Sequence, residues 1–265
     1  MSTHEPLADR DSAPAPEDGA GASSRSAAVP ALPDAGRPRR WVGGLLVAVV
    51  CVLVLALVNA FVAQPFAIPS GSMENTLRVG DRVVVNKLAY RFGGTVHRGD
   101  VVVFDGRDSF LQDDGAGSGG LGGALRQLGS YLGLASPSET DFVKRVVGVG
   151  GDRVVCCDRQ DRITVNGVPV DESGYLFPGD TASSVPFDIE VPDGRLWVMG
   201  DHRSDSRDSR DHLGEPGGGT VPEDRVIGRA DWVVYPVGRW HHLRRPGGYD
   251  AVDAAGRGGR HGDQG

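Results

Sequence analysis

Two valine-rich runs joined by a glycine turn occupy the middle of the chain, at residues 142–156, which read FVKRVVGVGGDRVVC. Runs of β-branched residues bounded by glycine and aspartate are typical of short strands joined by tight turns. The pattern recurs, and we expect strands at residues 81–87, 100–104, 142–149, 152–156, 163–165, 196–199, 226–230 and 232–234. Because no long helical pattern separates these runs, they predict a mainly β fold, a folded sheet or barrel.

The composition narrows the class of protein. The chain has 265 residues, with 28 lysines and arginines against 35 aspartates and glutamates, and a formal net charge of -7. Such a chain has no overall basic field, so nucleic acid is not an expected partner. Three cysteines are too few for a disulfide scaffold, and no Cys/His spacing indicates a zinc site. Adjacency disfavours a disulfide between Cys156 and Cys157, to which we assign no chemistry.

An uncharged stretch runs from Trp41 to Met73, and residues 41–63 within it are almost all apolar. At 1.5 Å per residue, a helix of this length spans about 34 Å, enough for the ~30 Å hydrocarbon core of a bilayer. A buried core helix is rarely apolar on every face for so long. A cleavable signal peptide has an apolar region of only ~7–15 residues, nearer the N-terminus. We therefore predict one transmembrane helix at residues 41–63, with the lipid bilayer as a partner.

The charges that flank this helix predict its orientation. Arg37, Arg39 and Arg40 precede it, and the next basic residue is Arg78. The positive-inside rule therefore places the N-terminus in the cytoplasm and the chain after the helix outside the membrane. We expect a disordered tail at residues 1–40, an extracytoplasmic β domain at 64–243 and a second disordered tail at 244–265.

The β domain is predicted to hold a glycine-rich insert at residues 105–140 and a small β subdomain at 153–196. Four leucines in the insert fall at helical spacing: Leu121, Leu125, Leu128 and Leu132. They fit either a short helix packed on the domain or a segment that rests on the membrane surface.

Lysine is rare in this chain, where Lys87 and Lys144 are the only two. A buried lysine can lose its proton, whereas arginine stays charged. In a strand over residues 141–148, Lys144 and Arg145 lie on opposite faces. Burial therefore favours Lys144 as the inward residue. The alternative is an edge strand from which both side chains extend into solvent.

Two more segments carry hydroxyl, carboxylate and imidazole groups. Residues 68–73 read IPSGSM and follow the apolar stretch closely, while residues 200–212 read GDHRSDSRDSRDH. Taken alone, these fit a Ser/Gly turn and a solvated loop. His202 and His212 suggest a Ser-His-Asp triad, but no nucleophile-elbow context accompanies them.

Together, these segments resemble the ordered motifs of bacterial type I signal peptidases. The matching stretches are residues 68–73 (IPSGSM), 80–87 (GDRVVVNK), 144–148 (KRVVG) and 200–210 (GDHRSDSRDSR). The resemblance covers most of residues 41–243. It implies a membrane-anchored serine endopeptidase with an all-β catalytic fold, which removes N-terminal signal peptides from exported preproteins after small residues. It implies no metal and no organic cofactor.

The resemblance also implies roles for individual residues. Ser72 would be the nucleophile and Lys144 the general base of a Ser–Lys dyad. The Ser70 hydroxyl and the Ser72 N–H would form the oxyanion hole. Ser206 would orient the Lys144 amine. Further support for the dyad would come from an ion pair between Asp208 and Arg210, and from Asp201 and Arg203.

Shallow apolar subsites are implied as well, around Phe66, Ile68, Pro69, Met73, Leu77, Phe142 and Val143. Shallow pockets reject bulky side chains before the cleaved bond, which fits the small residues that end a signal peptide. Residues 66–69 read as extended and bounded by proline, so the substrate is expected to pair with them as an added strand.

Three positions depart from the family pattern, since Asn75 and Gly150 stand where proline is usual and His202 where asparagine is frequent. They affect loop rigidity and remove no proposed reacting group. Two other functions stay open. One is a Ser–Lys protease of the self-cleaving repressor kind, against which the apolar anchor argues. The other is a non-catalytic, membrane-tethered β module that binds exported proteins and does not react with a serine-directed acylating probe. The sequence predicts no oligomeric state.

Overall fold

The computed structural model describes residues 37–107, 109–111 and 140–259. The chain divides into two compact units, residues 1–45 and residues 46–265. The second unit holds all the described strands and most of the apolar helix. Most of the tail expected at 1–40, the leucine-bearing part of the insert and the last six residues lie outside the described ranges.

Helix α1 (Arg37–Phe61) covers all but the last two residues of the predicted membrane span. Its segment Trp41–Phe61 is long and apolar enough to cross a bilayer, and no other helix in the described ranges is. The helix ends two residues before the predicted boundary at residue 63, because the chain enters strand β1 there. Lys87 Nζ donates hydrogen bonds to the carbonyls of Asn59 and Ala60, at 3.0 and 3.4 Å. These bonds satisfy carbonyl groups that a helix end leaves unpaired.

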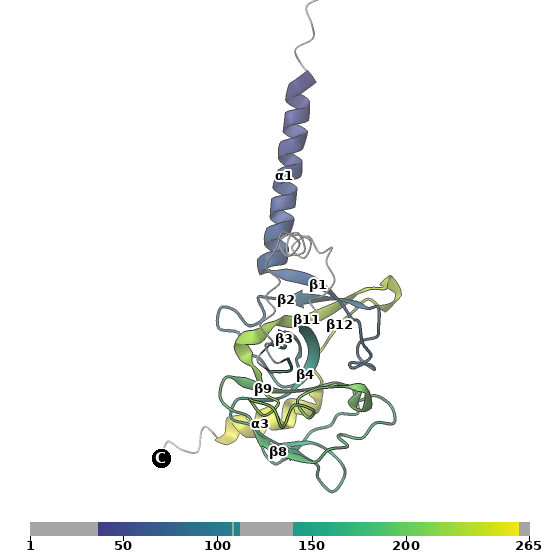
Figure 1. Ribbon diagram of the computed structural model, residues 1–265, viewed down its shortest axis with the longest axis vertical. Helices are drawn as coiled ribbons and strands as arrows, with labels where there is room; N and C mark the ends of the chain where they lie inside the picture. The colour runs from purple at the N-terminus through teal and green to yellow at the C-terminus, as the bar shows by residue number, and fades with distance from the viewer. Residues whose placement is uncertain (1–36, 108, 112–139, 260–265) are drawn as a thin grey trace, which may run out of the picture. The chain divides into compact units, whose positions relative to one another are not determined.

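Among the described residues, eight antiparallel strands form the larger sheet, in the order β1-β2-β11-β3-β4-β9-β10, with β12 beside β11 (Figure 1). Their bounds are β1 (Ala63–Ala67), β2 (Arg82–Asn86), β3 (Val101–Asp105), β4 (Asp141–Val149), β9 (Arg195–Met199), β10 (Val221–Pro222), β11 (Val226–Tyr235) and β12 (His241–His242). Short 3-10 turns connect some of them: η1 (Arg203–Asp205), η2 (Glu223–Arg225) and η3 (Val237–Arg239). The predicted mainly β fold is confirmed.

Register shifts bend this sheet. Strand β11 pairs with both β2 and β3, and its register slips between Ala230 and Trp232 and again between Val233 and Tyr235. Such bulges increase the local twist and curl a sheet. The bulge also explains why residues 226–230 and 232–234, predicted as two strands, form one.

The smaller sheet has the order β7-β6-β5-β8, formed by β5 (Arg153–Cys156), β6 (Thr164–Val165), β7 (Val168–Pro169) and β8 (Phe187–Glu190). It lies within the subdomain predicted at residues 153–196. Asn166 and Gly167 both have positive φ in the β6–β7 hairpin, as a two-residue turn requires. The sequence-based expectation for the cysteines was wrong, since Cys156 and Cys157 are joined by a disulfide bond.

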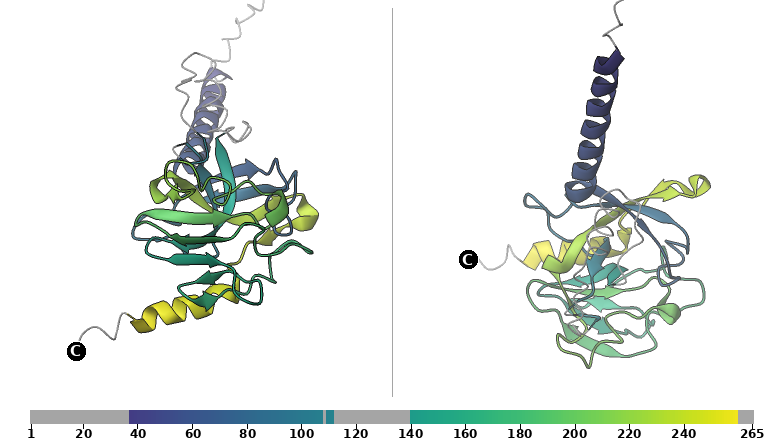
Figure 2. Two further views of the ribbon diagram at one scale, coloured as in Figure 1. Left: turned by 60° about the horizontal axis from the view of Figure 1, so that its bottom comes forward. Right: turned by 45° about the horizontal axis from the view of Figure 1, so that its top comes forward.

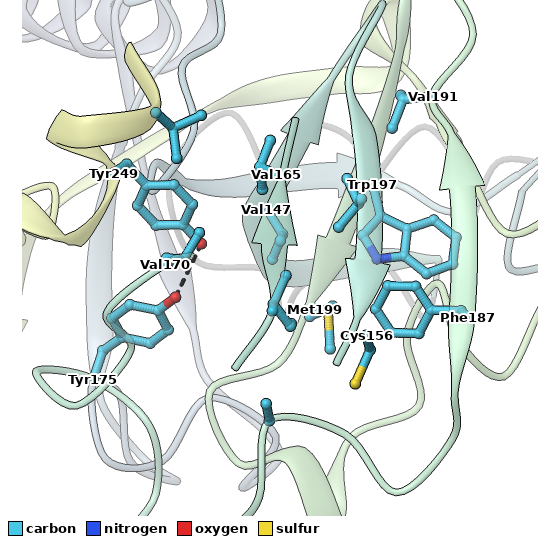
Figure 3. Packing of buried hydrophobic residues seen from close by; sticks show 14 residues of the cluster. Val147, Cys156, Val165, Val170, Tyr175, Phe187, Val191, Trp197, Met199 and Tyr249 are labelled. Carbon is cyan, nitrogen blue, oxygen red and sulfur yellow. Dashed lines mark hydrogen bonds between the residues drawn. The ribbon is translucent and has the colours of Figure 1, made fainter. Parts of the chain in front are cut away.

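The C-terminal segment is ordered between residues 247 and 259, where disorder was expected. It forms the turn η4 (Gly247–Tyr249) and helix α3 (Asp250–Gly259), which is the yellow helix near the C-terminus in Figure 2. Helix α3 contacts β7. Tyr249 and Val252 insert into the core that also holds Trp197 (Figure 3). Glycine and alanine make up eight of residues 247–259, and the two apolar anchors, Tyr249 and Val252, are three residues apart in a stretch with no longer hydrophobic period.

Candidate active site

The Ser72 hydroxyl and the Lys144 amine are in contact in the structure, although they lie 72 positions apart in the sequence. Ser72 lies in the turn after β1, where the Leu77 N–H donates to the Met73 carbonyl at 2.7 Å. Lys144 lies in β4, between β3 and β9. Its Nζ is 2.7 Å from Ser72 Oγ, and both residues are buried, at 4% and 8% exposure. The geometry allows a proton to pass directly between the two groups.

Burial shifts the protonation equilibrium of Lys144 toward the neutral amine. Desolvation of the amine lowers its pKa to about 8, although the carboxylates of Asp208 and Asp201 favour the ammonium form. The guanidinium of Arg210 acts with burial to lower this pKa. An appreciable fraction of the amine is therefore neutral at ordinary pH.

Ser70 lies beside the dyad. Its Oγ is 3.4 Å from Ser72 Oγ, and its residue is exposed. A hydroxyl in this position is close enough to reach an oxygen that develops negative charge next to Ser72.

The loop after β9 closes over the dyad through Gly200. A side chain at Gly200 would overlap the Ser72 carbonyl and the Ser206 hydroxyl. The Gly200 N–H donates to Asp208 Oδ2 at 2.9 Å, and the His202 N–H donates to the Ser72 carbonyl at 3.1 Å. The absence of a side chain at Gly200 thus permits close contact between this loop and the turn that holds Ser72.

The Asp208 carboxylate accepts most of the hydrogen bonds that hold the 200–210 loop together near the dyad. It accepts two hydrogen bonds from the Arg210 guanidinium at 2.8 Å and one from Ser206 Oγ at 2.8 Å. Burial would raise the pKa of Asp208, but the bonds from Arg210, Gly200 and Ser206 lower it overall. Within the described ranges Ser206 has no hydrogen bond to Lys144, so its contact differs from the predicted one.

Asp201 and Arg203 do not pair with each other. Asp201 accepts two bonds from Arg145, at 2.7 and 2.6 Å. Arg203 pairs with Glu172 at 2.5 Å. Burial would lower the pKa of Arg145, but the Asp201 carboxylate raises it, so the guanidinium stays charged. Lys144 is therefore not the only inward basic residue of β4.

Arg145 and Glu172 were missed by the sequence analysis. Both are buried, at 2% and 6% exposure, and both neutralise groups of the 200–210 loop. Arginine is so frequent in the chain that the sequence did not distinguish Arg145 as a site residue. No pattern near Glu172 indicates that it pairs with Arg203.

Most of the predicted substrate-lining residues pack together. One apolar cluster contains Phe66, Ile68, Met73, Leu77 and, at its partly buried edge, Val143. Phe142 packs in another cluster, with its ring 5.8 Å from that of Phe104, and Pro69 is exposed.

The cavity that opens between Arg145, Tyr175 and the chain at residues 239–248 has a volume of about 630 Å³. Ser72 and Lys144 do not line it, so it is separate from the dyad. In the described part of the chain, no group of three or more histidine, cysteine or acidic side chains is arranged to hold a metal ion.

A serine hydroxyl in contact with a buried lysine amine on a mainly β domain defines a candidate hydrolase site of the Ser–Lys class. Residues 39–235 match the sequence profile of the family "Signal peptidase, peptidase S26", and the chain belongs to this family. This finding confirms the resemblance seen in the four motifs.

Relatives with curated descriptions support the same family. The chain is 39% identical over 224 residues to a probable signal peptidase I of Mycobacterium leprae, covering 74% of this chain and 76% of the relative. It is 40% identical over 225 residues to signal peptidase I of Mycobacterium tuberculosis, covering 75% and 74%. A crystal structure of a signal peptidase I from Enterococcus faecalis overlaps 51% of this chain and 96% of its own, at 19% identity and a TM-score of 0.31, which is too low to compare the folds.

Proposed function

We propose that the protein is a membrane-anchored endopeptidase that removes N-terminal signal peptides from exported preproteins after small residues. Ser72 is the nucleophile and Lys144 is the general base. The observation that carries this assignment is the 2.7 Å contact between a buried hydroxyl and an amine whose pKa is lowered to about 8. At pH 7 about a tenth of such an amine is neutral, roughly 300-fold more than at the ordinary pKa.

The reaction proceeds in two halves. Neutral Lys144 takes the Ser72 proton as Oγ attacks the carbonyl carbon of the scissile peptide. The resulting ammonium gives that proton to the leaving amine, which departs as the new N-terminus of the mature protein. The signal peptide is left as an ester on Ser72. Lys144 then takes a proton from water as the water oxygen attacks the ester, and returns that proton to Ser72 Oγ as the acyl–oxygen bond breaks. The signal peptide leaves with a free carboxyl group.

The neighbouring groups stabilise this chemistry. The Ser70 hydroxyl and the Ser72 N–H donate to the oxyanion of the tetrahedral intermediate. Asp208 and Arg210 hold the 200–210 loop against the Ser72 turn. The Ser206 hydroxyl holds the Asp208 carboxylate by a 2.8 Å hydrogen bond. This bond supports a role in fixing Asp208 better than a role in orienting Lys144.

Strand β1 offers a binding edge for the substrate. It lies at the end of the larger sheet and pairs with β2 along one side, and no described strand pairs with its other side. An extended peptide can add to such an edge by main-chain hydrogen bonds. Apolar subsites that accept small side chains are then formed by Phe66, Ile68, Pro69, Met73, Leu77, Phe142 and Val143.

The short stretch of sequence between helix α1 and Ser72 supports a site near the bilayer. Ser72 follows the end of the helix by 11 residues. The arginines at positions 37, 39 and 40 favour a cytoplasmic N-terminus. The domain then lies on the outer side, where the end of a translocated signal peptide emerges.

Cleavage of an exported precursor by the purified protein in detergent tests this function. We expect a new N-terminus directly after a small residue, and no cleavage by Ser72→Ala or Lys144→Met. A binding module without catalysis would instead retain the precursor uncut and fail to react with a serine-directed acylating probe. Full cleavage by either variant would contradict the dyad.

A further inference from the structure

The C-terminal segment, residues 244–259, reaches a buried polar network close to the dyad. Tyr249 is fully buried, and its Oη is 2.9 Å from Tyr175 Oη (Figure 3). A side chain at Gly248 would overlap the Asp171 carbonyl, so the two backbones are in close contact. Asp253 in α3 accepts from Arg98 and Arg245 at 2.8 and 3.0 Å. The segment is therefore held by apolar, hydrogen-bonded and ionic contacts together.

The direction of the hydrogen bonds follows from proton counting. Burial raises the pKa of both Tyr175 and Tyr249, so both hydroxyls keep their protons. Tyr175 donates its single proton to Glu172 Oε1 at 2.8 Å, which leaves Tyr249 as the donor to Tyr175. Glu172 accepts from Arg203 at 2.5 Å, and Arg203 Nε donates to the Gly200 carbonyl at 2.8 Å. A continuous chain of hydrogen bonds thus joins Tyr249 to Gly200.

Gly200 is the residue that touches the nucleophile turn. Its backbone lies so close to the Ser72 carbonyl that no Cβ fits between them, and its N–H is held by Asp208. A displacement of Arg203 would move Gly200, and with it Ser72.

A second route leads to the base through its neighbour Arg145. The Arg145 guanidinium lies 4.2 Å from the centre of the Tyr175 ring and donates to the Gly99 carbonyl at 2.8 Å. A Cβ at Gly99 would lie 2.9 Å from Tyr249 Cδ2, so Gly99 is in contact with the C-terminal segment. The side chain next to Lys144 in β4 is thus fixed by groups that Tyr249 touches.

We propose that Tyr249 is a positioning residue for the Ser72–Lys144 pair, acting through Tyr175 on the first route and through Tyr175 and Gly99 on the second. This inference rests on the proposed function. Loss of the Tyr249 hydroxyl would loosen Glu172, Arg203 and Arg145 without removing a reacting group. The amine of Lys144 would then gain water, and its distance from Ser72 would vary more.

The variant Tyr249→Phe tests the proposal, because it removes one oxygen and keeps the packed ring. Tyr235→Phe is the matched control, since Tyr235 is exposed and lies outside the network. We expect Tyr249→Phe to lower kcat about tenfold near neutral pH with KM changed less than about twofold. The control is expected to match the wild type.

A second readout needs no substrate. Acetic anhydride labels neutral amines, and mass spectrometry can follow Lys144 and Lys87 separately because the chain has no other lysine. We expect the labelling midpoint of Lys144 to move to higher pH in Tyr249→Phe, while that of Lys87 stays in place. If the wild type cleaves no precursor, the proposed function fails, and this midpoint still decides the inference.

A purely structural role for Tyr249 would lower the melting temperature and leave both kcat and the Lys144 midpoint unchanged, which would overturn the proposal. If Tyr249→Phe does not fold, Asp253→Asn takes its place, because it loosens the same segment from Arg98 and Arg245. We expect a smaller shift of both readouts in the same direction. Unchanged readouts, with α3 released as judged by amide exchange, would also overturn the proposal.

Discussion

Lys144 and Arg145 are adjacent in β4 and both buried, yet their pKa values shift in opposite directions. Lys144 faces a hydroxyl, and burial lowers its pKa. Arg145 faces the Asp201 carboxylate and keeps its proton. An amine can neutralise when it is desolvated, whereas a guanidinium must be paired. The difference in partner thus separates a candidate base from a structural cation.

The pH dependence of cleavage should report the titration of Lys144. The amine is active when neutral, so kcat/KM is expected to rise with pH and to level off above a pKa of about 8. Rates measured between about pH 6 and about pH 10 on one peptide substrate would show this limb. A profile already flat at pH 7 would contradict the assignment of Lys144 as base.

Burial of Lys144 should also lower the stability of the protein. Between the folded pKa of about 8 and the ordinary value of 10.5, the unfolded chain binds more protons. Stability therefore rises with pH across this window, and the whole cost, up to about 3 kcal/mol, is present below pH 8.

The variant Lys144→Met removes this cost. We expect its free energy of unfolding at pH 7 to exceed that of the wild type by up to about 3 kcal/mol, with the difference shrinking as pH approaches 10.5. Denaturant unfolding of both proteins in detergent, at pH 7 and at a pH close to the ordinary lysine pKa of 10.5, measures this difference in free energy. A methionine variant that is less stable than the wild type at pH 7 would show that desolvation of the amine does not destabilise the folded protein.

Ser70 gives a third prediction at the scale of residues. If its hydroxyl stabilises the oxyanion, Ser70→Ala should lower kcat about 100-fold and leave KM nearly unchanged. Ser204→Ala is the control, since its exposed hydroxyl bonds to Asp180 and to no other residue in the described ranges. Equal kcat for Ser70→Ala and the wild type would remove Ser70 from the oxyanion hole.

The ordered motifs identified Ser72, Lys144 and the pair Asp208–Arg210, because each falls at a fixed place in a short pattern. The structure brings these residues together, while their catalytic roles remain predictions. Sequence could not identify the partners of Asp201 and Arg203. Those ion pairs join segments far apart in the chain, and 26 arginines offered too many alternatives.

At the scale of elements, contact between the Gly200 loop and the turn after β1 holds the site together. Gly200→Ala would drive a methyl group into the Ser72 carbonyl. We expect activity to fall about 100-fold, since small displacements of a reacting group have effects of this size. Gly238→Ala, where a Cβ would meet nothing within 4 Å, should retain wild-type activity. Normal activity of Gly200→Ala would show that the loop does not constrain Ser72.

Valine-rich runs bounded by turn residues carry a local signal, which predicted β2, β3, β4, β5, β6, β9 and β11. The sequence analysis did not predict β1, β7, β8, β10 or β12 as strands. We predicted two strands in place of β11 because the polar residue Asp231 interrupts the apolar sequence pattern. Asp231 lies at a bulge, and the pairing of β11 with β2 continues on both sides of it. Helix α3 was missed for a different reason. Its order comes from the burial of Tyr249 and Val252 in a core built by distant strands, which composition cannot show.

For the whole molecule, the flanking charges should decide which side of the membrane carries the catalytic domain. Protease added to intact spheroplasts is expected to digest the domain of the wild type. When Arg37, Arg39 and Arg40 are replaced by glutamine, part of the protein should insert in the opposite orientation, with its domain protected from the protease. The same replacement at Arg78, Arg82 and Arg91 should give no protected fraction. Protection of the wild-type domain would reverse the proposed orientation.

The ionisation of one amine tests the whole account most directly. The chain has two lysines, so 13Cε-labelled lysine gives two NMR resonances, and Lys144→Met assigns them. In detergent micelles, the Lys144 resonance is predicted to titrate with a midpoint at about 8. A midpoint near the ordinary value of 10.5 would mean that Lys144 stays charged beside Ser72 and cannot serve as its base.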